Sequence, residues 1–98
     1  MAQMKRVTGV ATSIRREGKD TCVRYHNTDV VRFDDSRLKI VLNTGSWKTA
    51  TTKTRMNQAS NQFGLGYGVY QKKGDWFVNY KGQTIPFIKD ELVLEVQS

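Results

Sequence analysis

Few side chains in this 98-residue sequence could act as nucleophiles, bases or metal ligands. It holds one histidine, His26, and one cysteine, Cys22, both in an alternating stretch that predicts a strand. Four residues of a strand span about 13 Å, which is too far for a thiolate–imidazolium pair. One histidine with one cysteine also falls short of the three or four ligands of a metal site. We therefore expect no enzymatic activity, no metal and no cofactor.

Two shorter motifs favour structure over chemistry. The adjacent carboxylates Asp34 and Asp35 could bind a divalent ion, but adjacent acids in FDDSR are more typical of a turn. The glycine-rich run GLGYG, from Gly64 to Gly68, follows a predicted helix and leads into a predicted strand. A phosphate-binding loop needs the opposite order, strand and then helix. We interpret these glycines as a helix end with close packing.

The segment 47–62, WKTATTKTRMNQASNQ, has an unusual polar side for a helix. No acid occurs between Asp35 and Asp75, and the polar positions of the segment carry basic or amide groups. Asn and Gln are mediocre residues for a helix surface, which indicates that something other than helix stability selected them. The residues concerned are Lys48, Lys53, Arg55, Asn57, Gln58, Asn61 and Gln62.

Three interpretations of this segment remain open. Backbone amides at the helix start, with Thr hydroxyls and the basic residues Lys48, Lys53 and Arg55, can bind a phosphate, while Asn and Gln can read an adenine edge. An amide-rich face can equally dock on a protein or on a second copy of the chain, with Trp47, Tyr70 or Arg55 as anchors. The third interpretation is a solvated helix face without a function.

A second candidate is an aromatic run in the last third of the chain. Sheets that bind single-stranded nucleic acid stack bases on such rings beside basic side chains. About half of these rings must face the core of so small a domain, which limits the candidates for stacking. The rings are Tyr67, Tyr70, Trp76, Phe77 and Tyr80, and the interleaved lysines are Lys72, Lys73 and Lys81.

Positive charge is concentrated in the first half of the chain. The net charge is +7, with twelve Lys and Arg against five acids in residues 1–55 and four of each in the remainder. Such asymmetry attracts nucleic acid, nucleotides or an acidic protein, with Arg15 and Arg16 as further candidate contacts, although it can also serve solubility alone. No run of about 18 apolar residues predicts a membrane span, and no apolar N-terminal core predicts export.

The elements that would position these residues are short strands around one helix. Turn residues recur every eight to twelve positions, as in a meander of antiparallel strands, and Pro86 places its strand at an edge or a bulge. Threonines at 49, 51 and 52 can cap a helix start, and Gly64 can end it. We predict a single α+β domain over 1–98, an antiparallel sheet of about six or seven short strands with one helix packed on one face. The candidate strand segments, one or two more than this number, are 7–14, 21–26, 30–33, 38–42, 67–71, 76–80, 84–88 and 92–96, and the helix is 51–63.

Three stretches of the sequence resemble small tailed-bacteriophage proteins of unknown function. They are YHNTDVVRF, VLNTGSWKTATTKTRMNQASNQFGLGYGVYQ and GDWFVNYKGQTIPF, and the resemblance covers about two-thirds of the chain, from 21 to 87. The N-terminal MAQMKRVTGVATSI and the tail KDELVLEVQS depart from that group. The resemblance implies action in the cytoplasm of an infected bacterium and carries no site residue with it.

These observations predict a small, non-enzymatic phage protein that binds nucleic acid, a nucleotide or another phosphate ligand through its basic surface and helix start. The alternative is an inhibitor that binds an acidic host or defence protein, a counter-defence, anti-CRISPR-like role in host takeover. We expect no membrane partner, and a homo-oligomer is possible within either interpretation. The candidate binding residues are Arg15, Arg16, Trp47, Lys48, Lys53, Arg55, Asn57, Gln58 and Tyr70.

Overall fold

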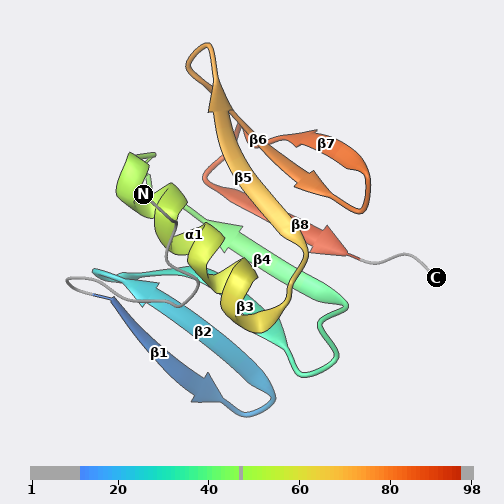
Figure 1. Cartoon of the computed structure of the whole chain (residues 1–98). Helices are drawn as coiled ribbons and strands as arrows, with labels where there is room; N and C mark the ends of the chain where they lie inside the picture. The colour runs from blue at the N-terminus through green and yellow to red at the C-terminus, as the bar shows by residue number, and fades with distance from the viewer. Residues whose placement is uncertain (1–11, 47, 96–98) are drawn as a thin grey trace.

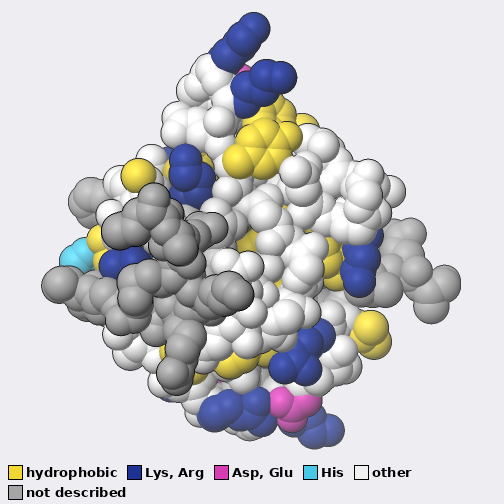
Figure 2. Space-filling view, viewed as in Figure 1, with side chains coloured by type: hydrophobic (Ala, Val, Ile, Leu, Met, Phe, Trp, Pro, Cys, Tyr) yellow, Lys and Arg dark blue, Asp and Glu magenta, His cyan; other side chains and the backbone are white. Residues whose placement is uncertain are grey.

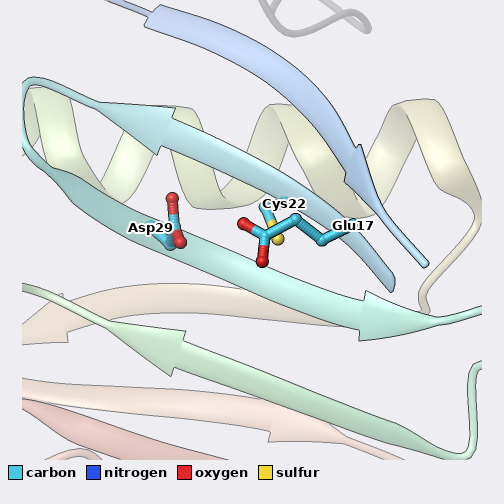
Figure 3. Close-up of side chains that lie close together, drawn as sticks. All are labelled: Glu17, Cys22 and Asp29. Atoms are coloured by element: carbon cyan, nitrogen blue, oxygen red, sulfur yellow. The ribbon is translucent and has the colours of Figure 1, made fainter. Parts of the chain in front are cut away.

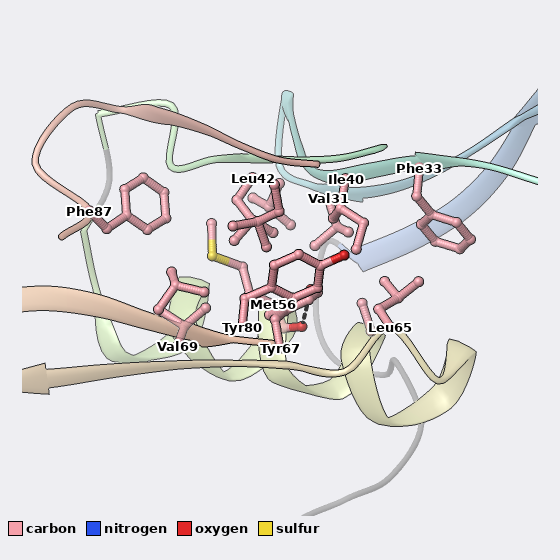
Figure 4. Packing of buried hydrophobic residues seen from close by; sticks show 14 of the residues in the cluster. Val31, Phe33, Ile40, Leu42, Met56, Leu65, Tyr67, Val69, Tyr80 and Phe87 are labelled. Carbon is pink, nitrogen blue, oxygen red and sulfur yellow. Dashed lines mark hydrogen bonds between the residues drawn. The ribbon is translucent and has the colours of Figure 1, made fainter. Parts of the chain in front are cut away.

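The fold consists of two layers with the hydrophobic core between them (Figures 1 and 4). The structure is a computed structural model that describes residues 12–46 and 48–95. One layer is a five-stranded antiparallel sheet, and the other holds a single helix beside a three-stranded antiparallel sheet. The predicted α+β class, antiparallel with one helix, is confirmed. The prediction that α1 packs on a face of a sheet is also confirmed, since the helix contacts β2 and β3 of the large sheet.

The large sheet has the strand order β1-β2-β3-β4-β8. The first four strands form a meander, and the last strand of the chain returns to pair with β4 along its whole length, from Lys39↔Glu95 to Asn43↔Glu91. The strands are β1 (Thr12–Glu17), β2 (Asp20–Tyr25), β3 (Thr28–Asp34), β4 (Lys39–Asn43) and β8 (Glu91–Glu95).

The small sheet is a separate meander with the order β5-β6-β7. Its strands are β5 (Tyr67–Lys72), β6 (Asp75–Tyr80) and β7 (Gln83–Pro86). Pro86 lies in β7, an edge strand that pairs only with β6 among the described residues, so the edge position predicted from this proline is confirmed. The sequence predicts one sheet, whereas the structure has two.

The helix α1 (Ala50–Phe63) begins and ends as its sequence predicts. Thr49 is the N-cap, and its hydroxyl accepts a hydrogen bond from the Thr52 N–H at 3.2 Å. Gly64 ends the helix with φ 64°, in the left-handed conformation that glycine adopts without steric cost. The apolar residues Met56, Ala59 and Phe63 recur at spacings of three and four and predict the inner face of the helix. Met56 and Ala59 are fully buried, and Phe63 is partly buried against the core.

Side chains of α1 bind the main chain of β5 and so attach the helix to the edge of the small sheet. The Ser60 hydroxyl donates to the Tyr67 carbonyl at 2.6 Å and accepts from the Tyr67 N–H at 3.1 Å. One turn earlier, the Asn57 amide binds both main-chain groups of Val69. An unpaired strand edge is an aggregation hazard unless something covers it, and here the helix covers it.

The core lies between the layers and draws on both of them. Figure 4 shows the rings of Tyr67 and Phe87 and the side chain of Met56 meeting aliphatic residues from β3 and β4 of the large sheet. Within the described chain, α1 is too short and too polar to cross a membrane. The buried core residues are Val23, Val30, Val31, Phe33, Ile40, Leu42, Met56, Ala59, Leu65, Tyr67, Val69, Trp76, Val78, Tyr80, Phe87 and Leu94.

Candidate nucleic-acid interface

The outer face of the small sheet carries a row of apolar rings. The cross-strand registers Tyr70↔Phe77 and Phe77↔Pro86 place these three side chains side by side on one face. The rings of Tyr70 and Phe77 stack with their centres 5.6 Å apart and an interplanar angle of 26°. Both are only half-buried, and Pro86 is exposed. The row is therefore open to a planar ligand.

Two exposed lysines adjoin this row. Lys72 follows Tyr70 by two residues on the same face of β5, and Lys73 lies in the turn that connects β5 with β6. Every ion pair among residues 12–46 and 48–95 involves Arg15, Arg16 or Arg32, so neither lysine is paired there. Figure 2 shows hydrophobic side chains directly below two basic groups at the top of the view, where Figure 1 places this turn.

The other three candidate rings point inward. Tyr67, Trp76 and Tyr80 are each at most 6% exposed, and they alternate along their strands with the outward-facing residues. The Tyr67 hydroxyl donates to the Met56 carbonyl at 2.6 Å, and its burial raises the pKa of the phenol. The alternation of the strands therefore assigns two of the five rings to the surface.

The basic residues around the helix start are engaged with the protein itself. Lys48 Nζ donates to the carbonyls of Phe87 and Ile88 at 3.1 and 2.8 Å, which ties the start of α1 to the segment before β8. Lys53 Nζ lies 5.8 Å from the centre of the Trp76 ring. The predicted convergence of lysines on a phosphate at the helix start is therefore not what these contacts favour.

Arg55 is held in a similar way. Its Nε donates to the Thr12 hydroxyl at 2.9 Å, and its guanidinium lies 5.8 Å from the centre of the Tyr25 ring. It has no ion pair within the described part of the chain. No described acid therefore neutralises the charge of Arg55, and contacts with β1 and β2 fix the position of its side chain.

Arg15 and Arg16 lie on β1 and are neutralised by acids. Arg15 donates to both oxygens of Asp29 at 2.6 and 2.7 Å and to Glu17 at 2.8 Å. These hydrogen bonds raise the pKa of Arg15 and lower the pKa of Asp29. Arg16 likewise donates to both carboxylate oxygens of Asp35, and this contact lowers the pKa of the Asp35 carboxyl. Arg15 and Arg16 are thus each compensated locally.

A thiol lies inside this network. Figure 3 shows the carboxyl groups of Glu17 and Asp29 beside Cys22, and the three ligand atoms lie within 4.8 Å of one another. A thiolate with two carboxylates could bind a metal, but the Arg15 guanidinium already occupies both carboxylates. Burial of Cys22 raises the pKa of its thiol, which opposes the thiolate that a metal needs. We interpret the cluster as an ion-pair network above a buried cysteine.

The amide residues of the helix differ in their availability. The Asn57 amide is hydrogen-bonded to the main chain of Val69. Gln58 is only 2% exposed and lies beside Arg55. Asn61 is exposed and its side chain has no hydrogen bond to the rest of the described chain. Asn57 and Gln58, which the sequence suggested as contacts, therefore have structural roles here. The candidate anchor Trp47 lies outside the described residues.

The sequence analysis missed a hollow that adjoins the ring row. It has a volume of about 400 Å³ and lies between α1 and the small sheet, over Gly68. The signal was present in GLGYG, where Gly68 is a glycine inside a strand. Such a glycine often marks the close approach of a ligand, whereas we had assigned it to packing. The hollow is lined by Asn57, Asn61, Tyr67, Gly68, Val69, Tyr70 and Asn79.

Comparison with known proteins places the chain in a phage family. No curated protein and no solved structure matches it. Residues 2–94 match the family described as Kyanoviridae Gp96 protein. This agrees with the resemblance to tailed-bacteriophage proteins seen in the sequence, and it covers more of the chain than the three stretches did. Because the match spans nearly the whole chain, the protein belongs to the Kyanoviridae Gp96 family of bacteriophage proteins.

Proposed function

We propose that this phage protein binds single-stranded nucleic acid on the outer face of the β5-β6-β7 sheet, in the cytoplasm of the infected bacterium. The observation that supports it is the outward-facing stacked pair Tyr70–Phe77 beside the unpaired lysines Lys72 and Lys73. The proposal moves the site from the helix start to the sheet. The reason is that Lys48, Arg15 and Arg16 are occupied by carbonyls and carboxylates.

The ring row supplies the affinity for bases. Each base stacked on an aromatic side chain contributes about 1–3 kcal/mol by alanine substitution, and the contact tolerates any base because each has a π-face. Tyr70 and Phe77 lie almost parallel, and the register continues the row to the exposed Pro86. This surface suits unstacked bases, which a duplex does not offer.

The lysines supply the contact with the backbone. For single strands, the logarithm of the binding constant falls with the logarithm of the salt concentration with a slope of about −0.7 for each neutralised phosphate. Loss of Lys72 and Lys73 together should reduce this slope by about 1.4 if each contacts one phosphate. The salt dependence of binding therefore measures the contribution of the lysines separately from that of the rings.

The test is a binding titration of a fluorescent hexa-uridylate at several salt concentrations. Tyr70→Leu keeps an apolar side chain beside Phe77 and should weaken binding about tenfold with an unchanged salt slope. The double variant Lys72→Gln/Lys73→Gln should weaken binding and flatten the slope. Its matched control is Lys19→Gln/Lys39→Gln, which removes one exposed lysine from the turn between β1 and β2 and one from β4. Equal effects of the two double variants, or no binding by the native protein at about 50 mM salt, would refute the proposal.

The second candidate function, binding of a host or defence protein, has its own supporting observation. A hollow of about 660 Å³ lies between β7 and β8, with Ile85, Val93 and Leu94 among its lining residues. Within the described chain these are the outer strands of their sheets, so each has an edge without a strand partner. An extended segment of another protein can add to such an edge by main-chain hydrogen bonds.

A pull-down from host bacterial lysate separates the two functions. Val93→Lys places a charge in the hollow at a residue that is 40% exposed, so the fold should tolerate it. A protein captured in stoichiometric amount by the native chain and by Tyr70→Leu, but not by Val93→Lys, would support docking at this edge. Recovery of nucleic acid without such a protein would reject it.

A further inference from the structure

Gly68 differs from the other described glycines. Each of the others has a φ between 60° and 85°, in the left-handed region where glycine is favoured, whereas the φ of Gly68 lies outside that region. A Cβ atom built on Gly68 would meet no atom within 4 Å. Neither backbone conformation nor packing therefore requires a glycine at this position.

A glycine there has a cost. Glycine in the middle of a strand destabilises the fold by about 0.5–1 kcal/mol relative to alanine, because its backbone loses more freedom and it has no side chain to pack. Gly68 lies within β5 and pairs with Asn79 of β6, so it is in a regular part of the sheet. A glycine that the fold does not need indicates that something other than the fold uses the space above it.

The space above Gly68 has the size and lining of a site for a small polar ring. The hollow of about 400 Å³ is bordered by the Tyr70 ring on one side and by helix α1 on the other. The residues that line it are three asparagines, two tyrosines, a valine and Gly68, and none of them is charged. Figure 2 shows the corresponding region between the helix and the top of the small sheet as mostly white, the colour of uncharged polar groups and backbone.

Two amide side chains are available to a ligand in this hollow. The Thr84 hydroxyl donates to Asn79 Oδ1 at 3.0 Å, which orients this amide and leaves its Nδ2 as a donor. Asn61 can turn to offer both a donor and an acceptor, since its amide makes no hydrogen bond to the described residues. Asn57 is not available in this way, because Val69 already holds both ends of its amide.

We propose that the hollow over Gly68 binds an adenine base, with Tyr70 packing against it and Asn61 and Asn79 contacting its edge. The inference rests on the proposed function and gives it a base preference. An asparagine amide pairs with the N6 donor and N7 acceptor of adenine. On the same edge guanine presents two acceptors, O6 and N7, which Arg or Lys typically binds, and the lining holds no charged group.

The adenine can come from a nucleic-acid strand or from a free nucleotide, and the probes distinguish these sources. They are hexa-adenylate, hexa-uridylate, AMP, GMP and ribose 5-phosphate, each titrated by calorimetry against the native chain and the variants. We expect hexa-adenylate to bind more tightly than hexa-uridylate by about tenfold, the lower part of the range for one amide–base pair. AMP should bind more tightly than GMP, and ribose 5-phosphate should not bind.

The decisive variant is Gly68→Val, which fills the hollow without strain because of the ordinary φ and the free space at Cβ. It should unfold at the same or a higher denaturant concentration than the native chain, and it should bind hexa-adenylate about tenfold more weakly. Gln83→Val is the matched control, since it adds the same side chain to an exposed position of the same sheet, on β7 away from the hollow. Asn61→Ala, on the helix surface, should lower the preference for adenine without a loss of stability.

The outcomes separate this inference from the proposed function. If Gly68→Val binds hexa-adenylate as the native chain does, or if both oligonucleotides lose affinity equally, the adenine site is wrong while strand binding on the ring row stands. If only AMP binds, and Gly68→Val abolishes it, the adenine site is supported with a free nucleotide as its ligand and the proposed function fails. If no probe binds the native chain, both fail.

Discussion

The amide of Asn57 on α1 binds Val69 of β5 in the way that a neighbouring strand would. Its Nδ2 donates to the Val69 carbonyl at 2.9 Å, and its Oδ1 accepts the Val69 N–H at 2.8 Å. A single side chain thus satisfies both main-chain groups that the edge of β5 presents at this residue. This contact joins the helix and the small sheet into one layer.

Replacement of Asn57 should therefore destabilise the fold. Asn57→Ala leaves a donor and an acceptor of Val69 without partners, and we expect a loss of about 1–3 kcal/mol in the free energy of unfolding. Urea denaturation measures it. The control is Asn61→Ala, one helical turn later, which brings the same gain in helix propensity but removes no hydrogen bond within the described chain. Equal stability of the two variants would show that the Val69 contact contributes nothing.

The buried hydroxyl of Tyr67 should contribute in a similar way. It donates to the Met56 carbonyl at 2.6 Å inside the core, as Figure 4 shows. Tyr67→Phe removes the donor and keeps the ring, so we expect a loss of about 1 kcal/mol in the free energy of unfolding. Tyr70→Phe is the control, because that ring is half-buried and its hydroxyl has no hydrogen bond to another described residue. Thermal unfolding of the two single variants compares them directly, and a control that loses as much stability would contradict the assignment.

The Arg15–Asp29 pair predicts a loss of stability in acid. Its hydrogen bonds lower the pKa of Asp29 in the folded state, so the folded protein holds fewer protons than the unfolded chain at pH values between the two pKa values. The contribution of Asp29 is thus complete above its unfolded pKa of about 3.9 and is lost as the pH falls through the lower, folded value. The stability gap between the native chain and Asp29→Asn should be constant near neutral pH and shrink in that acidic range.

Urea denaturation between pH 6 and pH 2 measures this gap. Asp75→Asn is the control, since Asp75 is exposed and forms no ion pair within the described residues. The gap in the free energy of unfolding between the native chain and Asp75→Asn should not shrink in the same way. A gap for Asp29→Asn that widens in acid would contradict the lowered pKa.

Cys22 should resist thiol reagents as long as the protein is folded. The side chain is fully buried beneath the Arg15 network, and burial raises the pKa of the thiol, which lowers the fraction of reactive thiolate. We expect the reagent to react only as fast as the protein opens, and to react at the rate of a free cysteine in urea. A colorimetric thiol assay follows both. Rapid modification of the folded chain would mean that Cys22 is accessible from the outer face of the large sheet.

The elements with local signals were predictable from the sequence. Capping chemistry identified the ends of α1, from the N-cap Thr49 to Gly64, and the period of three and four identified Met56 and Ala59 as core residues. Each predicted strand overlaps an observed strand. These features depend on interactions between residues close together in the chain, which sequence patterns describe well.

The division into two sheets was not predictable in this way. The β8 strand returns to β4 from a distant part of the sequence, and Asp90 secures that return through hydrogen bonds with Thr44 and Ser46. The contacts of the candidate binding residues were hidden for the same reason. Arg15 and Asp29 are 14 residues apart, so the sequence does not show that this arginine is already paired. Only the pairing of strands reveals which cations are already neutralised.

Lys73 affects both the stability of the fold and the proposed binding of nucleic acid. It is the first residue of the two-residue turn between β5 and β6, with φ 53° before Gly74 with φ 85°. Positive φ at both central residues defines a type I′ turn, in which Asn-Gly is strongly preferred. A lysine at this position costs stability, since residues other than Gly, Asn and Asp rarely adopt positive φ. Replacement of Lys73 therefore changes both the stability of this turn and the charge beside the ring row.

Lys73→Asn should thus stabilise the protein and weaken its binding to nucleic acid. We expect the free energy of unfolding to rise by about 0.5–1 kcal/mol from the relief of strain, and the affinity for hexa-uridylate to fall. Lys81→Asn is the matched control, because Lys81 and Gly82 form the same kind of turn at the other end of β6, with φ 51° and 75°. The Lys81 ammonium lies 5.6 Å from the inward-facing Tyr80 ring, away from the outer face. Both variants should gain stability, while only Lys73→Asn should lose affinity; an equal loss in Lys81→Asn would place the nucleic acid elsewhere on the protein.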